Sequence, residues 1–297
     1  MEGCLIKSWQ RDKRPARLFQ VARRTVGCHR LVPGFLPTVG LVWIWLGGIV
    51  LVPLFGVFLK ASTLGWAGVL RICGDDRVLA ALRLSLTTAL IAACINALIG
   101  SIIAWVFVRY SFFGKRFFDL LIDLPFALPT AVGGMALTSL YAPTGWIGRW
   151  LTMVGITVVY RPLGIILALV FVGLPFVVRV VQPVLEDLDR DLEHVAATLG
   201  ASRWQTLCHV ILPTIRSAIL TGFMMAFSRG VGEYGSVIFI AGNIPRFTEI
   251  TPLLIAIRLE EFDYAGATAI AATLLLISLI LLLVMNGFQA FWARRLA

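Results

Sequence analysis

Charged side chains are scarce in this sequence. Lysine, arginine, aspartate and glutamate make up 14% of its 297 residues, whereas 59% of the residues are hydrophobic. A soluble globular domain carries about 25% charged and about 45–50% apolar residues. The composition therefore excludes an ordinary soluble domain and indicates a chain embedded largely in lipid.

Signs of metal binding, disulfide bonding and catalysis are also lacking. The five cysteines are scattered and without C-x-x-C spacing, and the three histidines do not have metal-ligand spacing, so we expect no disulfide framework and no metal site. The sequence contains no G-x4-GK[ST] loop to hold the phosphates of ATP. A membrane enzyme would need a nucleophile and a base within its spans. We therefore expect no catalytic residue and no cofactor bound by this chain.

The formal net charge of +10 does not indicate a nucleic-acid partner, because the basic residues sit in short connections beside apolar segments. Most of the 26 lysines and arginines fall in the N-terminal arm, in the connections after the second and fourth apolar segments, and in the tail. Positive charge collects on the cytoplasmic side of membrane proteins. This distribution predicts that both termini are cytoplasmic.

Six apolar segments are long enough for the roughly 20 helical residues that cross a bilayer. In lipid the backbone must satisfy its own hydrogen bonds, so we predict an all-α membrane protein of six transmembrane helices. The segments are 36–59, 80–108, 120–141, 163–181, 214–241 and 265–288. The predicted organisation is a basic cytoplasmic arm (1–35), a first helix (36–60), a core of five helices (78–292) and a cytoplasmic tail (293–297). Proline and glycine within the spans indicate a packed bundle rather than single anchors.

A polar module, "DLEHVAATLGASRWQTLCHVILP" (191–213), interrupts the apolar segments on the predicted cytoplasmic side. We predict one helix over 186–199, a left-handed cap at Gly200, and a second short helix over 202–210 that turns off at an angle from the first. Pro213 then marks the entry to the fifth span. The first helix carries an apolar stripe formed by Leu188, Leu192, Val195 and Leu199. Such a face is suited to a groove on another protein. The alternative is a helix lying on lipid, which favours basic rather than acidic residues.

The same module resembles the loop EAA-x3-G-x9-I-x-L-P of ABC importer permeases, which forms the coupling helices that dock onto the ATPase subunits. Gly200 and the Leu212–Pro213 ending match, but His194 stands at the family's glutamate position and Glu193 lies one residue early. The resemblance implies a coupling loop over 186–213 in which Glu193 replaces the usual carboxylate. Its implied coupling residues are Glu193, His194, Ala196, Ala197, Gly200, Ala201, Leu212 and Pro213.

Four further segments, "LPFALPTAVGG", "YAPTGWIG", "GEYGSVIFIAGNIP" and "TEITPLLI", resemble the permease subunits of sulfate/thiosulfate ABC importers of the CysT type. This resemblance implies the type I ABC importer permease (MetI-like) fold and alternating-access transport of sulfate or thiosulfate across a bacterial inner membrane. The implied partners are two ATPase subunits that bind ATP-Mg, a second homologous permease subunit and a periplasmic sulfate-binding protein. Molybdate or another oxyanion is the near alternative. An ATP-independent channel or a membrane enzyme is the alternative of a different class.

Two charges, Arg229 and Glu233, fall within the predicted fifth span, where a charge is costly and marks a candidate functional site. They are four residues apart and so share a helix face. One interpretation is a mutually neutralising pair. The other is an oxyanion path in which the Arg229 guanidinium and glycine backbone amides face the substrate. The candidate pathway residues are Arg229, Gly230, Gly232, Glu233, Tyr234, Gly235 and Ser236. For Asp119 and Asp123 we expect ordinary pairing or helix-end solvation.

Overall fold

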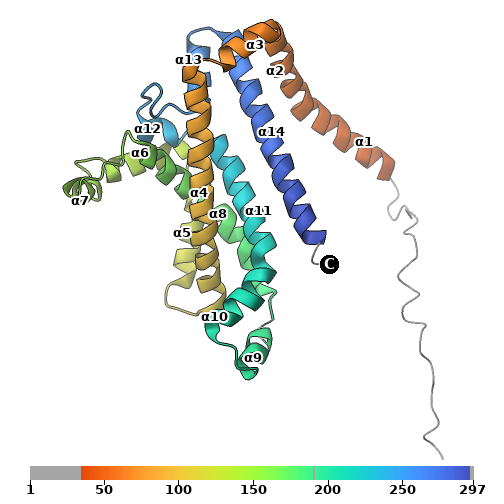
Figure 1. Ribbon diagram of the computed structural model, residues 1–297, viewed down its shortest axis with the longest axis vertical. Coiled ribbons are helices and arrows are strands. Elements are labelled where there is room, and N and C mark those ends of the chain that lie inside the picture. Colours follow the sequence, from red (N-terminus) through yellow and green to blue (C-terminus); the bar gives the residue numbers. More distant parts are fainter. Residues whose placement is uncertain (1–34, 190, 295–297) are drawn as a thin grey trace, which may run out of the picture. The chain divides into compact units, whose positions relative to one another are not determined.

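The computed structural model describes residues 35–189 and 191–294, and every regular element in these ranges is a helix (Figure 1). The elements are α1 (Phe35–Leu46), η2 (Gly47–Leu51), α2 (Val52–Ser62), α3 (Gly65–Cys73), α4 (Asp76–Arg109), α5 (Lys115–Ala127), α6 (Thr130–Tyr141), α7 (Gly148–Met153), α8 (Pro162–Glu186), α9 (Asp191–Thr198), α10 (Arg203–Thr206), η3 (Leu207–Ile211), α11 (Leu212–Val231), α12 (Val237–Ala241), α13 (Thr251–Glu260) and α14 (Tyr264–Arg294). The predicted arm, apart from Phe35, lies outside the described residues, as do Arg190 and the last three residues of the predicted tail.

The chain divides into two units, residues 1–54 and 55–297. The apolar helix Pro37–Ser62, which begins in the first unit, is 26 residues long and lies where the first span is predicted. Four further helices are long and apolar enough to cross a membrane, and the pair α5–α6 gives a sixth candidate span. The predicted fold class, an all-α membrane protein with six spans, is confirmed.

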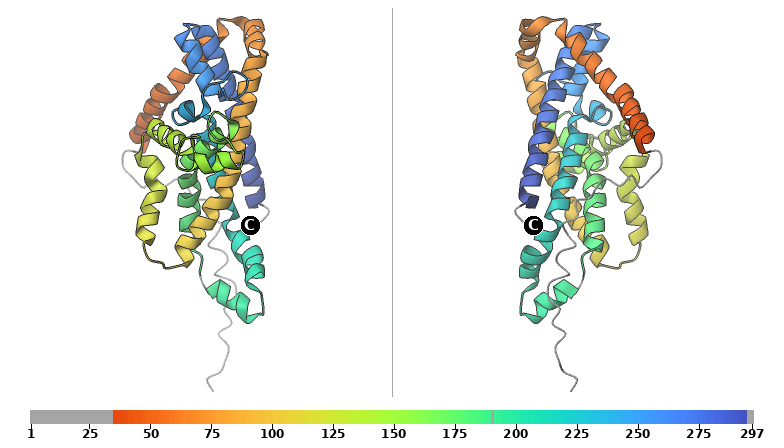
Figure 2. Two further views of the ribbon diagram at one scale, coloured as in Figure 1. Left: turned by 90° about the vertical axis from the view of Figure 1, so that its left-hand side faces the viewer. Right: turned by 90° about the vertical axis from the view of Figure 1, so that its right-hand side faces the viewer.

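The centre of the second unit is formed by α4, α8 and α11, which pack side by side (Figures 1 and 2). Their backbones approach closely around the buried side chain of Val177 on α8. A Cβ atom at Gly100 of α4 would lie 2.9 Å from that side chain, and one at Gly222 of α11 would lie 2.9 Å from the Val177 Cα. Small residues therefore set the spacing of the bundle, as expected for helices packed within a membrane.

The predicted third span, 120–141, is not a straight helix. It is the pair α5 and α6, which are bent by 113° at the break between them. Leu128 and Pro129 form this break in extended conformation, because a proline disfavours helical geometry at the residue before it. The bend directs α6 toward α12 (Figure 1).

The predicted fifth span, 214–241, is wrong at both ends. The helix begins at Arg203 and ends at Val231, and α12 is a separate short helix. Gly232 follows the last helical residue, and residues 232–236 form a turn. Apolar residues resume after this turn in α12, so hydropathy averaged over the segment did not reveal the break at Gly-Glu-Tyr-Gly-Ser.

The predicted second coupling helix is also different from the observed one. It is not a separate short helix over 202–210 but begins at Arg203 and continues through η3 into α11. The π turn makes this possible, because the Leu212 N–H bonds to the Leu207 carbonyl five residues back. Pro213 is the second residue of α11 and donates no hydrogen bond to the preceding turn of this continuous helix. The first coupling helix is shorter than predicted, because α8 ends at Glu186 and α9 begins at Asp191.

Candidate coupling and translocation sites

The turn between α9 and α10 is held by its own backbone at the lower end of the second unit (Figure 1). Gly200 has a left-handed conformation, with φ +83°. The Gly200 N–H donates to the Ala197 carbonyl and the Ala201 N–H to the Ala196 carbonyl, both at 3.0 Å. These two bonds form a Schellman motif, the common glycine-ended termination of a helix. The predicted glycine cap is thus present, and four of the predicted coupling residues build it.

The start of α10 is fixed by a capping box at Ser202. The Ser202 hydroxyl accepts from the Gln205 N–H at 3.3 Å, and the Gln205 side chain accepts from the Ser202 N–H at 2.8 Å. Such reciprocal bonds satisfy N–H groups that a helix start leaves without partners. Hydrogen bonds on both sides of the turn therefore fix the angle between α9 and α10.

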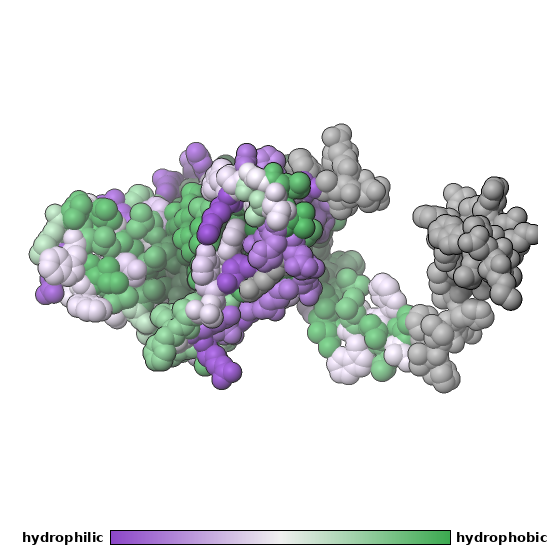
Figure 3. Space-filling model, turned by 90° about the horizontal axis from the view of Figure 1, so that it is seen from below, coloured by the Kyte–Doolittle hydropathy of each residue, from purple (hydrophilic) through white to green (hydrophobic). Residues whose placement is uncertain are grey.

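The apolar stripe predicted for this segment is divided between the core and the surface. Leu188 is buried in the core, whereas Leu192, Val195 and Leu199 are exposed by 48%, 55% and 83%. Trp204 on α10 is also exposed. Seen from below, hydrophilic residues gather around this end of the second unit, with apolar residues among them (Figure 3). We call Leu192, Val195, Leu199 and Trp204 the docking face.

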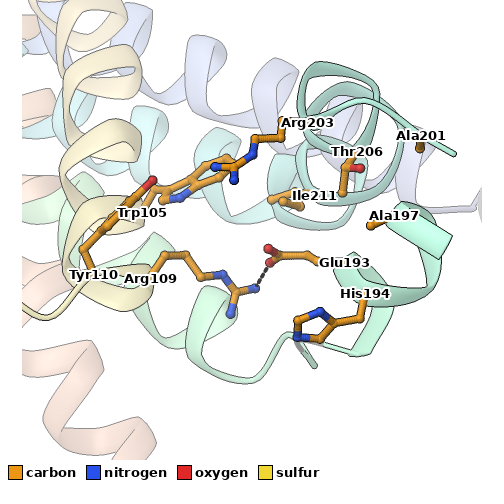
Figure 4. A pocket seen from close by; sticks show the side chains of 10 residues that line it. All are labelled: Trp105, Arg109, Tyr110, Glu193, His194, Ala197, Ala201, Arg203, Thr206 and Ile211. Carbon is orange, nitrogen blue, oxygen red and sulfur yellow. Dashed lines mark ion pairs between the residues drawn. The ribbon is translucent and has the colours of Figure 1, made fainter.

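We call the segment from α9 to α10 (residues 191–206) the docking loop. A pocket of about 440 Å³ lies between this loop and the last turn of α4 (Figure 4). It is lined by Trp105, Arg109, Tyr110, Glu193, His194, Ala197, Ala201, Arg203, Thr206 and Ile211. Within it, Arg109 Nη2 and Glu193 Oε1 form an ion pair at 2.6 Å. Arg109 Nη2 also donates to the Leu188 carbonyl at 3.4 Å. Glu193 therefore faces its own chain in this structure.

The remaining coupling residues lie beside Glu193 at the rim of this pocket or at the start of α11. His194 is exposed, next to the paired Glu193. Leu212 is half-exposed, and Pro213 follows it in the first turn of α11. The structure thus gathers most of the predicted set at one turn and separates Leu212 and Pro213 from it by η3. Contact of Glu193 with an ATPase subunit stays a prediction.

Arg229 and Glu233 are paired, although not within one helix as predicted. Arg229 lies near the end of α11, and Glu233 lies in the turn beyond it. Arg229 Nη1 and Glu233 Oε2 are 2.5 Å apart, with the glutamate side chain 1% exposed and the arginine 36%. The other Glu233 oxygen, Oε1, accepts from the Ser236 N–H at 3.0 Å and the Ser236 hydroxyl at 2.9 Å. In this conformation the arginine charge is balanced within the chain.

The glycines of this turn have different surroundings. A Cβ atom at Gly235 would lie 2.2 Å from the Thr130 hydroxyl of α6, so this glycine allows α6 to pack on the turn. A Cβ atom at Gly232 would meet nothing within 4 Å. Gly232 and Tyr234 are exposed on the same turn as the half-exposed Arg229, whereas Ser236 is buried. The open side of the turn therefore carries one arginine, one tyrosine and the exposed backbone of Gly232.

Sequence reasoning missed two arginine clusters. Arg179 lies within α8, not in a loop, and pairs with Asp119 at 2.9 Å and with Asp123 at 2.5 Å, which confirms the expected pairing of those carboxylates. Arg77 donates to the buried Glu249 through Nε at 2.8 Å and Nη2 at 2.7 Å. The spacing of Asp119 and Asp123 by one helical turn was a usable signal for the first cluster. No sequence pattern near Arg77 predicted its pairing with Glu249, which lies 172 residues away in the chain.

Comparisons with known proteins agree on the family. Residues 96–297 match the family described as binding-protein-dependent transport system inner membrane component. The chain is 44% identical over 270 residues to the sulfate transport system permease protein CysT of Escherichia coli (strain K12), covering 91% of this chain and 98% of that protein. It is 47% identical over 240 residues to the probable sulfate transport system permease protein cysT of Nephroselmis olivacea, covering 81% of this chain and 84% of that protein.

A solved structure shares the fold. A bacterial ABC transporter involved in the import of the acidic polysaccharide alginate superposes with a TM-score of 0.72 at 16% identity, covering 86% of this chain and 96% of that one. The identity is too low to carry more than the fold. The long apolar helices, the docking loop, the matched family and the extensive similarity to CysT proteins lead to one conclusion. This chain belongs to the family of binding-protein-dependent transport system inner membrane components, and within it to the sulfate permeases of the CysT type.

Proposed function

We propose that this chain forms part of the membrane pathway of an ATP-driven sulfate importer and receives its driving force through the loop between α9 and α10. The chain is an integral membrane protein and a permease subunit, and its sequence has no phosphate-binding loop of its own. An ATP-driven permease of this kind needs a separate ATPase. The proposed position in a bacterial inner membrane, with both termini cytoplasmic, follows from the arginine and lysine distribution.

The observation that carries the proposal is the docking face. The apolar side chains of Leu192 and Val195 on α9, of Leu199 just after it and of Trp204 on α10 are exposed. They surround a turn that is fixed by a Schellman motif and a capping box. Exposed apolar side chains at the polar end of a membrane protein mark an interaction site. A rigid helix with an apolar face fits a groove on a partner. An ATP-independent channel would not need this feature.

The proposed assembly contains two ATPase subunits with ATP-Mg, a second homologous permease and a periplasmic sulfate-binding protein. A solved structure with this fold is an alginate ABC transporter in complex with a pentasaccharide-bound periplasmic protein, which supports delivery by a binding protein. The substrate is sulfate or thiosulfate, with the similarity to sulfate transport permeases as support. Molybdate, which has the same charge and tetrahedral shape, is the alternative that competition must separate.

We further propose that Arg229 and its turn lie on the anion pathway. A half-exposed arginine beside exposed backbone at Gly232 offers positive potential without enclosing an anion. Weak interaction suits a pathway, because the substrate must leave it again. Glu233 neutralises Arg229 in this conformation. An anion that binds to Arg229 would therefore have to displace the Glu233 carboxylate.

The docking face is tested by introducing charge into it. Leu199→Glu together with Val195→Glu is expected to abolish co-purification of the ATPase subunits from detergent-solubilised membranes, while the permease remains at normal abundance. The control is Met153→Glu, which places one such charge on a comparably exposed apolar residue of α7. Full ATPase recovery with the double variant, or equal loss with the control, would contradict docking at this face.

A further inference from the structure

The ion pair between Arg109 and Glu193 ties the docking loop to α4. Arg109 is the last residue of α4, and Glu193 lies in the first turn of α9. Their atoms Nη2 and Oε1 are 2.6 Å apart, and Figure 4 shows the two side chains pointing toward each other across the pocket. The connection is a contact between residues that are far apart in the sequence.

Arg109 cannot easily be left without its partner. Its side chain is only 9% exposed, and in the described part of the chain its Nε atom has no hydrogen-bond partner. Removing one member of a buried ion pair is strongly unfavourable, because the remaining charge stays out of water. Separation of Glu193 from α4 would therefore leave the Arg109 charge without its partner.

The backbone connects the docking loop to α8 and to α11, but neither connection is a regular α-helix. After α8, residues 187–189 are not helical. The α10 helix continues through η3 into α11, but the π turn and Pro213, the second residue of α11, weaken the regular hydrogen-bond ladder there. In contrast, α4 is one unbroken α-helix of 34 residues, about 50 Å long at 1.5 Å per residue.

The opposite end of α4 is also held by an arginine. Arg77 makes two hydrogen bonds to the buried carboxylate of Glu249, just before α13. Two turns further along α4, the Ser85 hydroxyl accepts from the Thr251 N–H at 2.8 Å. A bidentate pair fixes orientation as well as distance. The segment before α13 is thus attached firmly to the first turns of α4.

We propose that the Arg109–Glu193 pair transmits the displacement of α9 to α4, and that α4 carries it to the Glu249 segment at its other end. Arg109, Glu193, Arg77 and Glu249 are then positioning residues that couple the two ends of the permease. This inference rests on the proposed function, since it requires an ATPase that displaces α9. It assigns Glu193 to its own chain rather than to the ATPase surface.

A charge exchange tests the first link. In the reconstituted complex, Arg109→Glu alone and Glu193→Arg alone are expected to lower the sulfate imported per ATP hydrolysed by about tenfold, within the usual range of a coupling free energy. Combining both changes is expected to restore most of the loss. The ATPase subunits should co-purify with all three variants. The proposal would be overturned if the double variant imported no more sulfate per ATP than the worse of the two single variants. Direct contact of Glu193 with the ATPase would give that result.

Two further variants keep this test decisive. Glu193→Gln removes only the charge of a partly exposed residue in the first turn of α9. This variant replaces Arg109→Glu in the test if Arg109→Glu does not reach the membrane. Asp191→Asn removes a neighbouring charge of the same helix and should leave the import ratio unchanged. An unchanged ratio with Glu193→Gln would overturn the proposal. Failure of the wild-type complex to import sulfate with ATP would instead contradict the proposed function.

The route through α4 predicts non-additive effects at its two ends. Glu193→Gln and Glu249→Gln should each lower the import ratio, and the double variant should be no worse than either, because one broken link already disconnects the ends. Independent contributions from sites far apart would add instead. Additive losses in the double variant would therefore contradict transmission along α4, even if the charge exchange succeeds.

Discussion

Glu233 is almost fully buried, and each of its oxygens has a different partner. One oxygen faces Arg229, and the other accepts from the backbone and hydroxyl of Ser236. A charge placed near the centre of a bilayer costs about 2.5–3.5 kcal/mol on insertion scales. Pairing offsets this cost, so the neutralising interpretation describes the present conformation. The pathway interpretation requires that Arg229 also meets the anion during transport.

Removing both charges separates these two interpretations. Arg229→Ala alone would leave a buried carboxylate unpaired, which costs roughly 3–5 kcal/mol and should lower membrane abundance. Arg229→Ala combined with Glu233→Gln removes that penalty, so abundance should recover. If Arg229 serves the pathway, sulfate uptake by the double variant stays low despite normal abundance. Normal uptake would show that the pair is only structural. Arg229→Lys, which keeps the charge, is the control.

Close packing between helices depends on a few glycines. The contact of α6 with the turn before α12 is the tightest of those near the candidate pathway. A Cβ atom at Gly134 would lie 2.3 Å from the Ser236 carbonyl oxygen. Because Ser236 also holds Glu233, the position of α6 and the geometry of the charged pair depend on each other.

Gly134→Ala is expected to destabilise the permease by about 1–3 kcal/mol, because backbone atoms cannot yield as a flexible side chain can. Thermal unfolding of the detergent-solubilised protein measures the change. Gly232→Ala is the matched control, since its added methyl group meets nothing within 4 Å and its φ of −92° suits any residue. Equal stability of the two variants would contradict the packing described here.

The elements also show what the sequence could predict. Length and hydropathy located all six candidate spans, and the signals at Gly200 and Ser202 predicted the turn of the docking loop, because both depend on neighbouring residues alone. The end of α11 at Val231 was missed because apolar residues resume in α12, although the glycines and Glu233 of the intervening turn were a usable signal. The π turn that carries α10 into α11, and the pairing of Arg109 with Glu193, depend on packing between distant segments, which a single sequence does not reveal.

At the scale of the whole molecule, charged side chains are few and their positions are informative. Arg109 with Glu193 joins the docking loop to one end of α4, and Arg77 with Glu249 joins the other end to the segment before α13. Arg179 ties α5 to α8 through two aspartates. In the described part of the chain, these three clusters each join segments that lie far apart in the sequence.

Sulfate uptake tests the central claim most directly. In a strain that lacks the gene for this chain, uptake of radiolabelled sulfate should be lost and should return when the chain is restored. Excess unlabelled sulfate or thiosulfate should suppress the restored uptake, and equimolar molybdate should suppress it much less. Unchanged uptake without the chain, or suppression by molybdate stronger than by sulfate, would contradict its role as a sulfate permease.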